Sequence, residues 1–122
     1  MKKILIVDDQ KEIRELVRVT LRIGDYEIIE ASSGDEAVTV AQAERPDLIF
    51  LDVMMPQSPL DGFEVCRALK GDPRTEGCTI VLLTALDKPE DLAKGEQAGA
   101  DDYFTKPFSP LQLMNKVDEV LG

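Results

Sequence analysis

Residues that could carry out chemistry stand directly after the strand-like segments of this sequence. Asp8 and Asp9 follow one segment, Asp52 follows another, and Thr84 and Lys106 come after two more. If the three carboxylates met within a few ångströms, they would repel one another and partly protonate unless a cation joined them. Hard oxygen ligands, without histidine or thiolate, favour Mg²⁺ over zinc or copper. The acidic residues therefore predict a magnesium site.

Thr84 and Lys106 supply the remaining groups needed to hold a phosphoryl group beside such a metal. The lysine brings positive charge, and the threonine brings a hydroxyl donor for the equatorial oxygens. Asp52 could then be the attacking nucleophile, because aspartyl phosphates are an established covalent strategy. Each residue alone has an ordinary explanation, since acidic pairs cap helices and Lys-Pro forms turns. The ordered set is much more specific than any one of its members.

Short apolar runs predict the strands that would position these residues. Four consecutive apolar residues at 48–51 are typical of a strand buried on both faces, as in a parallel sheet covered by helices. A similar run occupies 4–7, and we expect three further strands near 26–31, 79–83 and 102–104. Open α/β folds keep their ligand sites at the carboxyl edge of such a sheet. All the candidate residues fall at that edge.

Apolar residues at helical spacing, with capping residues before them and glycines after them, predict five helices. The first helix is expected from Lys11 to about Gly24, with Ile13, Leu16, Val17 and Leu21 at helical intervals. The second is expected from the Ser33–Glu36 capping box to about Ala43, with Ala37, Val38 and Ala41 facing inward. The last three are expected from Asp61-Gly62 to Gly71, from a capping box at Asp87–Glu90 to Gly99, and from Ser109–Gln112 onward, the last burying Leu113, Met114, Val117, Val120 and Leu121.

The alternation of five strands with five helices predicts the fold class. Right-handed crossovers make an open parallel sheet with helices on both faces the natural arrangement. We therefore expect a three-layer, doubly wound α/β fold forming one domain over residues 1–122. In that fold the first and third strands become neighbours where the winding reverses, so Asp8, Asp9 and Asp52 should converge.

Composition narrows the range of functions. Asp and Glu outnumber Lys and Arg by 24 to 14, and the net charge of −10 argues against direct nucleic-acid binding by this domain. The sequence has no histidine, which excludes Ser-His-Asp and Cys-His nucleophiles, so any phosphohistidine must belong to a partner. Cys66 and Cys78 fit neither a CxxC pair nor a metal cluster, and buried or idle thiols are expected. No run resembles a membrane span or a signal peptide, so we expect a cytoplasmic location.

These motifs together resemble the response-regulator receiver domain of two-component signalling, a CheY-like, flavodoxin-like fold with strand order 2-1-3-4-5. The resemblance covers the whole chain. The segments that carry it are Ile6-Val7-Asp8-Asp9, Leu51-Asp52-Val53-Met54-Met55-Pro56, Asp61-Gly62, Leu83-Thr84-Ala85, Gly99-Ala100-Asp101-Asp102-Tyr103 and Lys106-Pro107-Phe108.

The resemblance implies a role for each site residue. Asp52 would accept a phosphoryl group from a phosphohistidine on a sensor histidine kinase or phosphotransfer protein. The Mg²⁺ would be held by Asp8, partly through water, together with Asp9, Asp52 and the backbone carbonyl of Met54. Thr84, Ala85 and Lys106 would bind the phosphoryl group, and the Lys106-Pro107 peptide would be cis.

The resemblance also implies a switch and not an enzyme in the usual sense, although the domain would assist its own phosphotransfer and dephosphorylation. The Thr84 hydroxyl would move inward on phosphorylation, and Tyr103 would fill the vacated space. The altered surface would be the fourth helix, fifth strand and fifth helix. It would contact a downstream effector or output domain, with a phosphorylation-dependent homodimer as a further option.

Two features depart from the family pattern. Residues 57–60 lengthen the loop between Pro56 and Asp61-Gly62, either as a tolerated surface insertion or as a change in kinase docking. Met54 and Leu86 place apolar side chains beside the expected path of an attacking water, which predicts slow loss of the phosphoryl group.

Three other classes of protein share part of this pattern. A haloacid-dehalogenase-type phosphatase needs a second Asp two residues after the nucleophile, where this chain has Met54. A flavodoxin-like flavin carrier needs a phosphate-cradling loop after the first strand, where this chain has acids. A pseudo-receiver, acting as an unphosphorylated protein-binding module, would usually have lost the acceptor or the lysine, and both are present.

Overall fold

A computed structural model describes the backbone of residues 1–122 and every side chain except that of Ile23. Five parallel strands form one sheet in the order β2-β1-β3-β4-β5, which confirms the expected doubly wound topology. The strands are β1 (Lys2–Val7), β2 (Tyr26–Ala31), β3 (Leu48–Asp52), β4 (Thr79–Thr84) and β5 (Asp102–Thr105). The reversal of winding lies between β1 and β3, so the ends of these two strands are adjacent.

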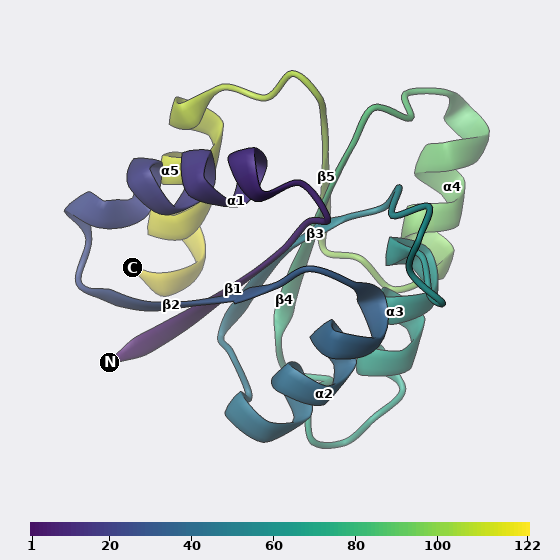
Figure 1. Cartoon of the computed structure of the whole chain (residues 1–122), viewed down its shortest axis with the longest axis horizontal. Helices are drawn as coiled ribbons and strands as arrows, with labels where there is room; N and C mark the ends of the chain where they lie inside the picture. The colour runs from purple at the N-terminus through teal and green to yellow at the C-terminus, as the bar shows by residue number, and fades with distance from the viewer.

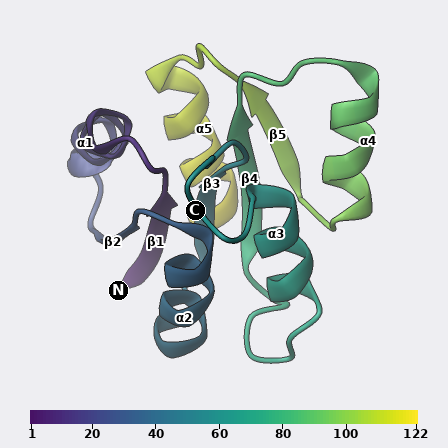
Figure 2. The same cartoon turned by 45° about the vertical axis from the view of Figure 1, so that its right-hand side comes forward.

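Helices cover both faces of the sheet, as Figures 1 and 2 show. Helices α1 and α5 lie on one face, and α2, α3 and α4 lie on the other, with α4 beside β5. Their bounds are α1 (Lys11–Thr20), the 3-10 helix η1 (Leu21–Ile23), α2 (Gly34–Glu44), α3 (Gly62–Lys70), α4 (Pro89–Gln97) and α5 (Pro110–Leu121). None of the described helices is long and apolar enough to cross a membrane.

The core is divided into two clusters by the alternation of side chains along each strand. Ile4 and Ile6 belong to a buried cluster with residues of α1 and α5, whereas Leu5 and Val7 belong to one with residues of α2 and α3. All five residues of β3 are buried, since this strand lies at the centre of the sheet. Burial on both faces is the physical reason for the unbroken apolar runs of β1 and β3.

Capping residues fix where most helices begin. Ser33, Asp61 and Ser109 each accept a hydrogen bond from the backbone N–H three residues later, and the sequence predicted the caps at Ser33 and Ser109. The predicted capping box at Asp87–Glu90 is wrong, because α4 begins one residue later. Lys88 is the N-cap residue, and the Asp91 carboxylate accepts a hydrogen bond from its N–H at 3.3 Å.

Two apolar residues that follow the helical pattern are not buried. Met114 is 36% exposed, which contradicts its predicted place in the core, while Leu113 and Val117 of the same helix are fully buried. Leu16 of α1 is 48% exposed. Both residues lie one position away from a buried neighbour, and the 100° rotation per residue of a helix carries them past the edge of the apolar face.

Candidate functional site

The three predicted acids meet at the carboxyl edge of the sheet. Val7 pairs with Leu51 across β1 and β3, so the residues that follow the two apolar runs are level. Asp8, Asp9 and Asp52 each offer a carboxylate oxygen within 4.8 Å of the others. Asp8 and Asp52 are buried and Asp9 is exposed. The sequence therefore correctly predicted that these acids would converge.

Lys106, which follows the edge strand β5, contacts two of the acids. Its Nζ lies 3.1 Å from Asp8 Oδ2 and 3.2 Å from Asp52 Oδ1, so one cation bridges both buried carboxylates. The backbone N–H of Lys106 donates to the carbonyl of Thr84 at 2.7 Å, which holds the loop after β5 against the end of β4. The Lys106-Pro107 peptide is cis, as the family resemblance implied.

The charges at this site are crowded. Burial, with the Asp8 carboxylate adding to it, raises the pKa of Asp52 to about 6, although Lys106 opposes the rise. Burial also raises the pKa of Asp8, against the hydrogen bond from the Gln10 N–H and the attraction of Lys106. Burial alone would lower the pKa of Lys106, but the two carboxylates outweigh it and the pKa is raised. A further positive charge would relieve this crowding.

An open cavity of about 300 Å³ gives access to the acids. It is lined by Asp9, Gln10, Asp52, Met54, Pro56, Ala85 and Lys106. Two of the three carboxylates, those of Asp9 and Asp52, line this cavity, and together with Asp8 they form the hard-oxygen donor set that suits Mg²⁺. Met54 lies on the rim with 52% of its surface exposed, where its backbone could complete such a set. The residues present therefore fit a magnesium ion.

Thr84 and Tyr103 are linked through one residue, Leu86. Thr84 is fully buried and is not part of the cavity lining, where its neighbour Ala85 lies instead. The Thr84 Oγ1 accepts a hydrogen bond from the N–H of Leu86 at 3.1 Å. The hydroxyl of Tyr103 donates to the carbonyl of the same Leu86 at 2.8 Å. The turn after β4 thus connects the candidate phosphoryl ligand to the candidate switch residue.

The longer loop at 57–60 is held firmly against α2. The hydroxyl of Ser58 accepts the N–H of Gly34 at 2.7 Å and donates to the carbonyl of Leu60 at 2.7 Å. A Cβ on Gly34 would lie 2.4 Å from that same carbonyl, so only glycine permits this close approach. The extra residues are therefore anchored to the first turn of α2.

Arg14 and Glu30 are site residues that the sequence did not reveal. Arg14 Nη1 donates to the backbone carbonyl of Asp8 at 2.7 Å, and its Nε donates to Glu30 at 3.1 Å. In the sequence both look like ordinary charged residues on the solvent side of a helix and of an edge strand. No spacing rule marks them, because their contact depends on how α1 packs beside β2.

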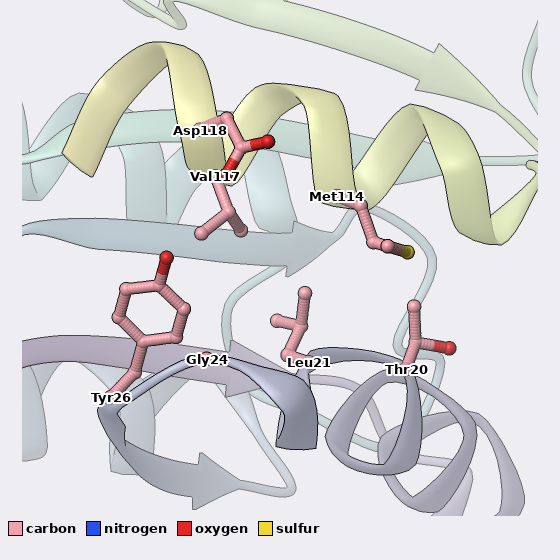
Figure 3. A pocket seen from close by; sticks show the side chains of 7 residues that line it. All are labelled: Thr20, Leu21, Gly24, Tyr26, Met114, Val117 and Asp118. Atoms are coloured by element: carbon pink, nitrogen blue, oxygen red, sulfur yellow. The ribbon is translucent and has the colours of Figure 1, made fainter. Parts of the chain in front are cut away.

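The structure holds another cavity, of about 220 Å³, at the opposite edge of the sheet. Figure 3 shows it between η1 and α5, with Leu21 and Val117 pointing into it and Tyr26 at one side. Tyr26 begins β2, whereas the acidic cluster follows the ends of β1 and β3, so the two cavities lie at opposite ends of the strands. Of its lining residues only Asp118 carries a charge, and this cavity lacks the grouped charges of the first.

Comparisons with known proteins agree with this arrangement. The family model described as response regulator receiver domain matches residues 4–118. The chain is 46% identical over 120 residues to the alkaline phosphatase synthesis transcriptional regulatory protein PhoP of Bacillus subtilis, which covers 98% of this chain and 48% of PhoP. The chain spans about half the length of the curated relatives it matches.

Solved structures give the same result over nearly complete chains. The chemotaxis protein CheY4 of Vibrio cholerae has a TM-score of 0.89 and 37% identity, covering 98% of both chains. The BeF3-activated DrrB receiver domain has a TM-score of 0.87 and 36% identity, covering 99% of this chain and 97% of the other. The chain belongs to the response regulator receiver domain family of two-component signalling.

Proposed function

We propose that this domain accepts a phosphoryl group on Asp52, in a Mg²⁺-dependent reaction, from a phosphohistidine on a partner kinase or phosphotransfer protein. The observation that carries the proposal is the placement of Lys106 Nζ within 3.2 Å of Asp52 Oδ1 beside a cluster of two further carboxylates. A nucleophilic carboxylate needs a cationic environment to approach an anionic phosphoryl group. The open cavity at this cluster gives the donor a path to Asp52.

The reaction is a simple transfer. An oxygen of Asp52 forms a bond to phosphorus, the P–N bond to the partner's imidazole breaks, and the electron pair of that bond stays on the imidazole nitrogen. The Lys106 ammonium neutralises charge on the phosphoryl oxygens. Since the chain has no histidine, the donor imidazole belongs to the partner. When bound by Asp8, Asp9, Asp52 and the Met54 carbonyl, Mg²⁺ supplies positive charge at the phosphoryl oxygens.

The switch that we propose starts at Thr84. In the structure its hydroxyl is occupied by the Leu86 N–H, and the Leu86 carbonyl is occupied by the Tyr103 hydroxyl. A phosphoryl group on Asp52 offers the Thr84 hydroxyl a stronger, charged acceptor. Movement of Thr84 toward this acceptor would break its hydrogen bond with the Leu86 N–H. Leu86 could then shift and release its hydrogen bond with the Tyr103 hydroxyl. Such a ligand shifts the population because it favours one of the two conformers.

The surface that responds would be α4, β5 and α5, since Tyr103 lies on β5 and a Cβ added at Gly95 of α4 would lie 3.0 Å from its ring. PhoP is a transcriptional regulatory protein of about twice this length, and we propose that this domain likewise controls an output domain or effector protein. We place it in the cytoplasm, where the free thiols of Cys66 and Cys78 fit a reducing environment. The domain would act as a switch that assists its own phosphorylation and dephosphorylation.

Incubation with acetyl phosphate, with and without Mg²⁺, tests the proposal by intact mass. The wild-type domain should gain one phosphoryl group only when the metal is present, and Asp52→Asn should gain none. Asp47→Asn, which removes an acid far from the cavity, is the matched control and should be phosphorylated normally. A wild-type domain that stays unmodified under all conditions would instead identify a pseudo-receiver that acts as a protein-binding module.

Beryllofluoride provides an independent measurement. The DrrB receiver domain has been obtained in a BeF3-activated state. We expect BeF3 with Mg²⁺ to change the environment of Tyr103, the switch residue, and to leave Tyr26 at the opposite edge of the sheet unaffected. The two tyrosine resonances therefore report the switch and its control in one NMR spectrum.

A further inference from the structure

Arg14 binds the backbone of the first metal-site acid. The guanidinium Nη1 donates to the Asp8 carbonyl at 2.7 Å, a short charge-assisted hydrogen bond, and the Arg14 side chain is only 16% exposed. The same Asp8 residue has its N–H bound to the carbonyl of Ala31 at 3.2 Å and its Oδ1 bound to the N–H of Gln10 at 2.9 Å. Together with Lys106, which binds Asp8 Oδ2, these partners hold both the backbone and the side chain of Asp8, and among the described side chains Arg14 is the one that binds its backbone.

Glu30 of β2 holds Arg14 in this position. Glu30 Oε1 accepts from Arg14 Nε at 3.1 Å, and Glu30 Oε2 accepts from Arg18 at 2.6 Å. Partial burial opposes ionisation of Glu30, but the hydrogen bonds from Arg18 and Arg14 outweigh it and lower the pKa of the carboxyl. The planar guanidinium has donors at fixed angles, so a charged Glu30 fixes the direction in which Nη1 points.

We propose that Arg14, oriented by Glu30, is a positioning residue for the magnesium site, which fixes the backbone of Asp8 so that its carboxylate faces Asp9 and Asp52. This inference rests on the proposed function. A residue that orients a metal ligand without touching the metal commonly changes metal affinity by about 10-fold or more when it is replaced. Here the orientation acts through the backbone carbonyl of the ligand.

The sign of the effect separates positioning from simple electrostatics. A cation near a Mg²⁺ site repels the metal, so its removal should strengthen Mg²⁺ binding if charge were all that mattered. Removal of a positioning residue should instead weaken binding. Arg18 provides the matched control, because it carries the same charge on the same helix and shares Glu30, yet its other contact is the carbonyl of Ile28.

The experiment compares wild type, Arg14→Met and Arg18→Met by calorimetric titration with MgCl₂, without any phosphodonor. Methionine keeps most of the apolar stem while it removes the hydrogen bonds and the charge. We expect Arg14→Met to bind Mg²⁺ about 10-fold more weakly. Arg18→Met should bind as tightly as wild type or more tightly. Arg14→Met binding that equals or exceeds the affinity of wild type would overturn the inference.

A second measurement needs no metal. Hydrogen exchange at the Gln10 amide, which donates to Asp8 Oδ1, should speed up in metal-free Arg14→Met and stay unchanged in Arg18→Met. Equal exchange in both variants would also overturn the inference. If Arg14→Met does not fold, Arg14→Gln is compared in the same way with Arg18→Gln. Failure of the proposed function would appear differently, as absence of Mg²⁺ binding by the wild-type domain.

Discussion

At the scale of single residues, the site is built on electrostatic conflict. Asp52 is buried beside Asp8, and Lys106 neutralises only part of their combined charge. Burial first, and then the Asp8 carboxylate, raise the pKa of Asp52 to about 6. The conflict makes the metal-free site unfavourable in its charged form, and it favours any ligand that brings positive charge. The repulsion between these carboxylates would therefore both favour a bound metal ion and lower the stability of the metal-free domain.

This raised pKa predicts how stability depends on pH. Because the folded domain holds the Asp52 proton more tightly than the unfolded chain does, its contribution to stability is lost as pH rises from about 4 through about 6. The metal-free domain should be about 1.5 kcal/mol more stable at pH 5 than at pH 7.5. Urea unfolding at the two pH values measures this difference. Asp52→Asn should remove most of it, and an equal difference in that variant would contradict the assignment.

Met54 and Leu86 predict a long-lived phosphorylated state. Both line a cavity beside the proposed phosphorylation site, and neither side chain can hydrogen-bond an attacking water. Met54→Asn and Leu86→Lys should each shorten the lifetime of the phosphorylated domain several-fold, measured by phosphate release. Val19→Asn changes an exposed apolar residue of α1 outside this cavity and should have no effect. Unchanged lifetimes in the first two variants would count against the prediction.

At the scale of elements, the loop between β3 and α3 and the first turn of α3 pack closely against the end of β3. The Gly62 N–H donates to the carbonyl of Val53 at 3.0 Å, and Asp61 caps α3 with its side chain. The first turn of α3 is therefore packed directly against the backbone that carries Asp52. The residues at 57–60 lengthen this loop, and Ser58 attaches them to α2.

Gly62 should tolerate no larger residue. A Cβ at this position would lie 2.4 Å from the carbonyl oxygen of Asp52 and 2.6 Å from Val53 Cα, both backbone atoms that cannot move freely. Gly62→Ala should destabilise the domain by about 1–3 kcal/mol, the usual cost of overpacking. Gly77→Ala, where no atom lies within 4 Å of the added Cβ, is the control. Equal unfolding midpoints in urea for the two variants would disprove this account of the packing.

At the scale of the whole molecule, binding of a metal at the acidic cluster would be linked to folding. The net charge is −10, and three of the acids have carboxylate oxygens within 4.8 Å of one another. A cation that binds only the folded domain stabilises it by mass action. The parallel sheet would make this coupling global, because Asp52 ends the central strand β3 and Asp8 directly follows its neighbour β1, and both strands contribute to the core.

Magnesium should therefore raise the stability of the domain. At a concentration one hundred times its dissociation constant, Mg²⁺ should add about 2.7 kcal/mol to the free energy of unfolding at pH 7.5. Asp9→Asn should lose most of this gain, while its metal-free stability changes little because Asp9 is exposed. Thermal unfolding with and without MgCl₂ measures both quantities. A gain of the same size in Asp9→Asn would exclude Asp9 as a metal ligand.

Much of the fold was predictable because its signals are local. The unbroken apolar runs of β1 and β3, the serine caps of α2 and α5, and the glycine that follows α3 each reflect the immediate environment of a few residues. The predictions that failed concern residues at the border of a buried helix face or at a helix end. Met114 lies just outside the buried face of α5, and Asp87 lies one residue before the true N-cap of α4.

The sequence by itself determined which residues meet at the candidate site, since acids, a threonine and a lysine at strand ends must share one edge of a parallel sheet. Only the tertiary structure decided how they are held. Two of the contacts that hold them are made through the main chain: Arg14 binds the Asp8 carbonyl, and the N–H and carbonyl of Leu86 connect Thr84 with Tyr103. A third, between Glu30 and Arg14, joins β2 to α1. Such contacts depend on distances between packed elements, which no spacing of residue types along the chain encodes.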